Sequence, residues 1–127
     1  MNFLAIVVGG GIGAASRYAL SRAITQMAGI NFPIGTITIN LIGCFVAGLL
    51  CGIFDKVLIS QNIRLFIIVG ILGGFTTFSA FGVETIMLLR SREFPLAVAN
   101  VLISTIGGLG LAFIGFWISD LIPLGRG

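Results

Sequence analysis

The chain has 127 residues, of which 57% are apolar and 9% are charged, and its mean hydropathy is +1.19. A soluble domain carries roughly a quarter of its residues charged, so this composition excludes a soluble enzyme, a nucleic-acid-binding module and a secreted disulfide scaffold. The charged residues leave four long uncharged runs, at 1–16, 23–54, 65–83 and 94–119. Because about 20 residues of helix cross a bilayer, we expect an all-α integral membrane protein with four transmembrane helices.

Turn-forming residues set the limits of these helices. The stretch at 29–33 ends in Pro33, which cannot continue a helix. Polar loops follow at 55–64 and 90–95, and Pro123 closes the last apolar segment. The whole chain, 1–127, is therefore predicted to form one transmembrane domain, and the predicted crossings are about 3–25, 34–54, 65–90 and 96–122.

The first crossing is rich in glycine. Gly9 and Gly13 are four residues apart, the spacing at which two membrane helices approach backbone to backbone. The same spacing recurs in two other crossings, at Gly48/Gly52 and Gly70/Gly74. One such pair is a weak signal, but three of them predict a closely packed bundle. Arg17 follows near the end of this helix.

The second crossing combines a short polar stripe with two cysteines. Thr36 and Asn40 are four apart and therefore share one helix face. Cys44 and Cys51 are seven apart within one apolar run, which excludes the usual zinc spacings and makes an internal disulfide implausible. We expect both cysteines to be packing residues.

The third crossing has an unusual centre. Two glycines and two threonines, at 73–77, lie at its midpoint and form helix poorly. Broken membrane helices of this kind commonly bind ions through freed carbonyls, so we predict a break near the midplane with the carbonyls of Gly73 and Thr76 facing a small cation. The alternative is a continuous helix with a glycine packing seam.

Two phenylalanines and one acid follow this centre. Phe78 and Phe81 are three apart, and their positive ring edges can attract an anion without trapping it. Glu84 is about 10 Å from the midplane at 1.5 Å per residue, and we expect it to pair with Arg17. In the fourth crossing, Asn100 and Ser104 form a second polar stripe. The amide of Asn40 and the hydroxyl of Ser104 supply donors for a desolvated anion.

Charge and depth both suggest a second copy of the chain. One side of the membrane receives Lys56, Arg64 and Arg126, and the other receives Arg22, Arg90 and Arg92. Since Lys/Arg asymmetry sets orientation, this chain is free to insert both ways; a single orientation set by other features is the alternative. The polar side chains occupy only one half of each crossing, so an antiparallel (dual-topology) homodimer would complete a path across the bilayer.

The sequence offers little for other chemistry. It has no histidine, no metal-ligand cluster and no nucleophile–base set, so we expect neither an enzyme nor a nucleic-acid-binding protein. A proton-coupled small-multidrug-type exporter is an alternative, but it needs a carboxylate in the first crossing, and residues 6–15 contain none. A non-transporting structural membrane protein is a further alternative.

Three segments carry a family resemblance over essentially the whole chain. They are residues 9–18 (GGGIGAASRY), 35–43 (GTITINLIG) and 73–81 (GGFTTFSAF), the last followed by Glu84. The chain resembles the CrcB/Fluc family of fluoride ion channels. The resemblance implies a dual-topology homodimer in the bacterial inner (plasma) membrane that exports cytoplasmic fluoride and so protects the cell from its toxicity.

The resemblance also assigns roles to individual positions. It implies that Phe78 and Phe81 are paired pore residues, that Asn40 is the pore-lining amide and that Ser104 belongs to a polar track. Gly73 and Thr76 match positions whose carbonyls hold a structural sodium ion, and Arg17 matches a vestibule arginine. The hydroxyls of Thr36 and Ser79 complete the predicted pore set.

Two positions depart from the family pattern. Ala80 stands where a threonine is frequent, and Asn100 stands where some members have tyrosine. The first leaves one pore hydroxyl in doubt, and the second leaves open how Phe78 is oriented.

Overall fold

Helices make up almost all of the computed structural model, which describes residues 2–124. Within this range the chain forms four helical segments that are long and apolar enough to cross a membrane, and it contains no strand. The prediction of an all-α chain with four membrane-length helices is confirmed. Arg126, one of the cations counted above, lies outside the described residues.

The third and fourth segments are composite. The first segment is α1 (Asn2–Ala28) and the second is α2 (Ile34–Phe54). The third consists of α3 (Gln61–Arg64), the π-helical η1 (Leu65–Leu72), α4 (Gly73–Phe75) and α5 (Phe78–Arg90). The fourth consists of α6 (Phe94–Leu102), the π-helical η2 (Ile103–Gly107) and α7 (Gly108–Leu121).

The first turn explains where α1 ends. Gly29 adopts a left-handed backbone with φ +60, a conformation that costs other residues free energy, and its N–H donates to Thr25 O at 3.1 Å. The helix therefore ends at Ala28 rather than at residue 25. Pro33 then precedes α2, which begins at the predicted residue.

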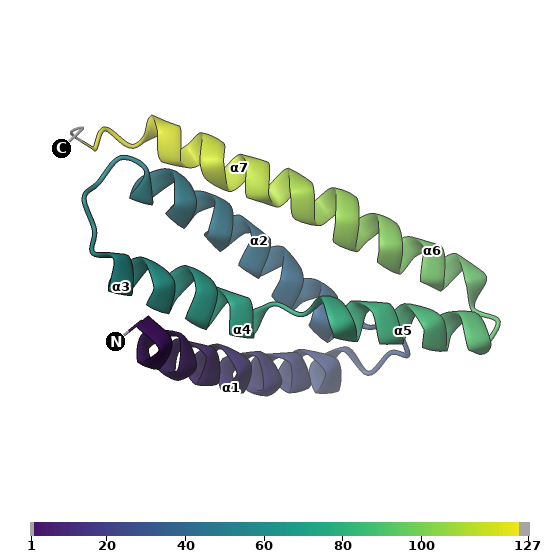
Figure 1. Cartoon of the computed structure of the whole chain (residues 1–127). Helices are drawn as coiled ribbons and strands as arrows, with labels where there is room; N and C mark the ends of the chain where they lie inside the picture. Colours follow the sequence, from purple (N-terminus) through teal and green to yellow (C-terminus); the bar gives the residue numbers. More distant parts are fainter. Residues whose placement is uncertain (1, 125–127) are drawn as a thin grey trace.

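The segments pack as an elongated bundle (Figure 1). α2 lies along α7, α1 lies along η1 and α4, and α5 lies beside α6 at the far end. Glycines permit the close approaches: a Cβ at Gly9 would lie 2.5 Å from the Phe66 carbonyl oxygen, and one at Gly48 would collide with the backbone of Ala112. The glycine pairs of the sequence therefore lie at helix contacts, as predicted.

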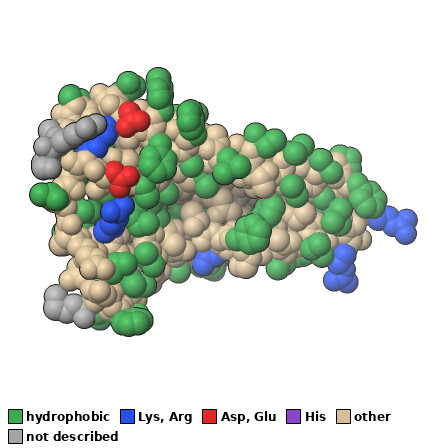
Figure 2. Space-filling view, turned by 45° about the horizontal axis from the view of Figure 1, so that its top comes forward, with side chains coloured by type: hydrophobic (Ala, Val, Ile, Leu, Met, Phe, Trp, Pro, Cys, Tyr) green, Lys and Arg blue, Asp and Glu red, His purple; other side chains and the backbone are tan. Residues whose placement is uncertain are grey.

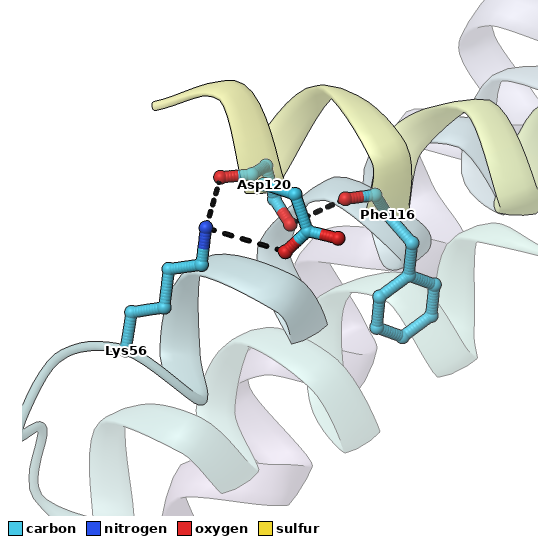
Figure 3. Close-up of polar contacts among 4 residues, drawn as sticks. Lys56, Phe116 and Asp120 are labelled. Atoms are coloured by element: carbon cyan, nitrogen blue, oxygen red, sulfur yellow. Dashed lines mark hydrogen bonds and ion pairs between the residues drawn. The ribbon is translucent and has the colours of Figure 1, made fainter. Parts of the chain in front are cut away.

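Polar contacts hold the end of α7 against the end of α2 (Figure 3). The Lys56 ammonium donates to the Ser119 carbonyl at 2.6 Å and lies 3.3 Å from an Asp120 carboxylate oxygen. A cation at a helix C-terminus also complements the helix dipole. Ser119 itself is fully buried and donates to the Phe116 carbonyl at 2.6 Å. Figure 2 shows that most of the charged side chains on this face lie near the two ends of the bundle, with one Lys or Arg side chain at the lower edge between them.

Candidate functional site

The centre of the third segment contains two residues of extended backbone. Thr76 has φ −82 and ψ 156, and Thr77 has φ −150 and ψ 113. These two residues, here called the extended pair, separate α4 from α5. β-branched residues after paired glycines disfavour the helical conformation here. The Thr77 hydroxyl accepts from the Ala80 N–H at 3.2 Å and caps α5.

Asn40 of α2 binds this extended backbone with both atoms of its amide. Its Nδ2 donates to the Thr77 carbonyl at 3.0 Å, and its Oδ1 accepts from the Thr77 N–H at 2.8 Å. The side chain thus pairs with Thr77 as a neighbouring strand would. The sequence predicted that Asn40 donates to an anion. One of its two amide hydrogens bonds to Thr77, and within residues 2–124 the other has no hydrogen-bond partner.

A central groove of 390 Å³ brings most of the predicted site together. Six predicted residues line it: Asn40, Gly73, Thr76, Phe78, Phe81 and Ser104. They come from α2, from the extended pair and the helices on both sides of it, and from η2. No Lys, Arg, Asp or Glu is among the lining residues. The groove is therefore apolar with a few hydrogen-bonding groups, and it has no fixed charge.

The two phenylalanines lie together at the start of α5. Their ring centroids are 5.4 Å apart, and the ring planes are tilted by 42°. Phe78 is 82% exposed, so the groove is open at this ring. Ser79 is exposed beside them, with its hydroxyl oxygen 3.2 Å from that of Thr77, and it does not line the central groove.

A second groove, of 440 Å³, is lined mostly by polar residues and holds two of the three remaining predicted residues, Arg17 and Thr36, whereas Ser79 lines neither groove. It lies between α1, α2 and α5 and is also lined by Glu84. Thr77 lines both grooves, so the extended pair forms part of the wall between them. The predicted site is thus divided between two neighbouring spaces rather than lying in one.

The expected pairing of Glu84 with Arg17 is not found. The Thr36 hydroxyl of α2 donates to Glu84 Oε1 at 2.7 Å. Within the described residues, Arg17 Nε and Glu84 Oε2 are both buried without a hydrogen-bond partner, and the ion pairs are Lys56–Asp120 and Arg64–Asp55. The carboxylate instead accepts a hydrogen bond from a hydroxyl of α2.

Two residues that shape the site were not predicted to have a site role. Thr77 separates the two grooves, and Asn100 connects α6 to α5 by donating to the Thr85 hydroxyl oxygen at 2.9 Å. Asn100 is only 1% exposed. The signal in the sequence was the stripe of Asn100 and Ser104, which indicates a shared face but does not identify the partner on α5.

The carbonyl oxygens at the end of α4 are the kind of ligand that a hard cation prefers. Gly73 and Thr76 both line the central groove, and the last carbonyls of a helix lack intrahelical donors. Thr77 donates its N–H to Asn40 and not to Gly73, four residues back. Within residues 2–124 there is no cluster of His, Cys, Asp or Glu suited to a metal, so a cation here would rely on backbone, hydroxyl and amide oxygens.

Comparison with known proteins identifies the family of this chain. The family model described as "CrcB-like protein, Camphor Resistance (CrcB)" matches residues 4–116. A protein of Methylobacillus flagellatus named fluoride-specific ion channel FluC is 42% identical over 113 residues, which are 87% of this chain and 88% of that protein. Proteins with the same name from Desulforapulum autotrophicum and Solibacter usitatus are 39% and 41% identical, over 95% and 96% of this chain and 98% of each relative.

These relatives are bacterial, and the four membrane-length helices make this chain a multi-pass bacterial membrane protein. The match extends over all four helical segments and includes every residue that lines the two grooves. The chain therefore belongs to the CrcB-like protein family.

Proposed function

We propose that this protein is a fluoride-selective ion channel that lets cytoplasmic fluoride leave the cell down its electrochemical gradient. The observation that carries the proposal is the central groove, which combines an amide, hydroxyls and two phenylalanine rings without any Lys, Arg, Asp or Glu. Relatives of this chain bear the name fluoride-specific ion channel. Export through such a channel would protect a bacterium from fluoride toxicity.

The groove's chemistry suits a small anion in transit. The positive edges of Phe78 and Phe81 attract an anion weakly, and the free amide hydrogen of Asn40 supplies a donor. A pore must bind its ion well enough to admit it and weakly enough to release it. Because no Lys or Arg lines the groove, no cationic side chain there would hold the ion too tightly.

The second groove would serve as the vestibule. Arg17 lines it and can concentrate anions at the mouth of the path. Thr36 keeps Glu84 hydrogen-bonded at 2.7 Å, which offsets part of that carboxylate's repulsion of anions. The exposed hydroxyl of Ser79 would add a donor near the extended pair.

The channel would be an antiparallel homodimer in the bacterial inner membrane. Phe78 is 82% exposed in the single chain, and a second, inverted copy would cover it. The even division of Lys and Arg between the two sides would permit dual topology, and the extended pair would then lie near the bilayer midplane, close to the two-fold axis.

A structural sodium ion would stabilise this dimer. The carbonyls of Gly73 and Thr76 from both copies would hold it, since oxygen ligands from unwound helices commonly bind sodium in membrane proteins. The ion would supply a fixed positive charge at the interface between the copies.

The test is ion efflux from liposomes that contain the purified protein. Fluoride should leave when a potassium ionophore balances the charge, and chloride should be retained under the same conditions. Fluoride retained at the level of empty liposomes would refute the channel. A proton-coupled small-multidrug-type exporter would instead require an imposed pH gradient, and a structural membrane protein would carry neither anion.

The pore residues are tested separately from the function. Asn40→Asp places an anion opposite the Thr77 carbonyl, and Phe81→Ile removes a ring edge. If both variants kept the fluoride flux of the unchanged chain, the assignment of the central groove as the pore would be wrong even though the chain conducts fluoride.

A further inference from the structure

A partly buried series of hydrogen bonds connects two residues of the central groove. The Ser104 hydroxyl donates to Asn100 Oδ1 at 3.3 Å, and Asn100 Nδ2 donates to the Thr85 hydroxyl oxygen at 2.9 Å. The Thr85 hydroxyl in turn donates to the Phe81 carbonyl at 2.7 Å. The series of hydrogen bonds therefore runs from η2, through α6, to the backbone of α5.

The Phe81 carbonyl, at the end of this series of hydrogen bonds, determines which group donates in each of them. A backbone carbonyl only accepts, so Thr85 must give its single proton to Phe81. The Thr85 oxygen then needs a donor, which places the amide nitrogen of Asn100 toward it and the amide oxygen toward Ser104. Ser104 must therefore donate its proton to Asn100.

The Ser104 hydroxyl has a different kind of partner from most threonine hydroxyls in the helical segments. Four threonines donate to the carbonyl four residues earlier, at distances from 2.6 to 3.0 Å; they are Thr38, Thr76, Thr85 and Thr105. The Ser104 hydroxyl is diverted to a side chain at 3.3 Å, which is long for a hydroxyl donor. Its proton is thus held more weakly than those of the threonines.

The local helix geometry accompanies this difference. Ser104 lies in the π-helical η2, where Ile103 N–H is shared between the carbonyls of Ala99 and Asn100. Short π-helical segments are frequent at functional sites. Ser104 and its neighbour Thr105 both line the central groove, and of these two Ser104 carries the more weakly held proton.

We propose that Asn100 is a positioning residue that keeps the Ser104 hydroxyl from bonding to a backbone carbonyl of its own helical segment and so keeps it available to an anion in the central groove. The inference rests on the proposed function. Fluoride is a strong hydrogen-bond acceptor and can take this proton from a long bond. Without Asn100, the hydroxyl would form the same short bond to a helix carbonyl that the threonines form, and the ion would lose a donor.

The experiment measures fluoride efflux from liposomes as a function of fluoride concentration. Asn100→Leu, which removes the amide at similar volume, should raise the half-saturating fluoride concentration about fivefold, the factor expected for one net hydrogen bond. Ser104→Ala should give the same shift, and the double variant should shift no further. An unchanged half-saturating concentration in Asn100→Leu would overturn the proposal, as would shifts that multiply in the double variant.

Two further variants keep the test decisive. Ser119→Ala removes another buried serine hydroxyl, which donates to the Phe116 carbonyl away from both grooves, and it should leave the half-saturating concentration unchanged. Asn100→Ser, whose side chain is too short to reach both partners, replaces Asn100→Leu if leucine prevents folding. If the unchanged chain carries no fluoride, the proposed function fails; if it does and the Asn100 variants match it, only this inference fails.

Discussion

Asn40 offers the most direct test of how the extended pair is held. Asn40→Leu keeps a similar volume but removes both hydrogen bonds to the Thr77 backbone, at 3.0 and 2.8 Å. Asn40 lies inside α2, and the backbone groups around it already bond within that helix, so they cannot replace these bonds. We expect α4 and α5 to lose their fixed relative position.

The size of the effect follows from the burial of the two backbone groups. An unpaired buried donor or acceptor costs about 1–3 kcal/mol, and Thr77 is only partly buried, so each group falls at the low end. The loss for both is therefore about 2–3 kcal/mol in the free energy of unfolding. Asn40→Asp keeps the acceptor for the Thr77 N–H but sets a carboxylate oxygen against the Thr77 carbonyl, so it should be no more stable than the leucine variant.

The assay is denaturant-induced unfolding in detergent, combined with fluoride efflux. Both variants should unfold at lower denaturant concentration and carry less fluoride than the unchanged chain. A leucine variant within about 0.5 kcal/mol of the unchanged chain, the range of ordinary surface substitutions, would refute the idea that Asn40 holds the extended pair.

Three further predictions concern packing, the rings and the cation. Gly13→Ala would force a Cβ into the backbone at Ile71 and Phe75 and should destabilise the bundle by about 1–3 kcal/mol in a melting assay. Gly11→Ala, with no atom within 4 Å of the added Cβ, should be neutral or slightly stabilising in the same assay. Equal melting temperatures for the two variants would contradict the helix contact. Phe81→Ile should lower fluoride flux about tenfold by removing a ring edge at an unchanged unfolding midpoint, and a normal flux would contradict the role of the ring. Replacing sodium by a large organic cation should lower both the melting temperature and the fluoride flux, and identical values in the two buffers would argue against the sodium site.

Short-range properties of the chain could be predicted from the sequence. The membrane location and the four helices follow from runs of apolar residues, because each run must satisfy its own backbone in lipid. Gly29 and Pro33 act within one turn of the helix ends, and the glycine pairs act through their own missing side chains. These effects depend on residues that are neighbours along the chain.

The partners of the polar side chains depended on tertiary structure. Spacing placed Thr36 and Asn40 on one face. The packing of α2 against the third segment then determined that Thr36 hydrogen-bonds to Glu84 and Asn40 to Thr77. Arg17 remained without Glu84 for the same reason. Helical periodicity determines which residues share a face, whereas the rotation of each helix about its axis is set by close packing with its neighbours, and that rotation decides which side chains meet.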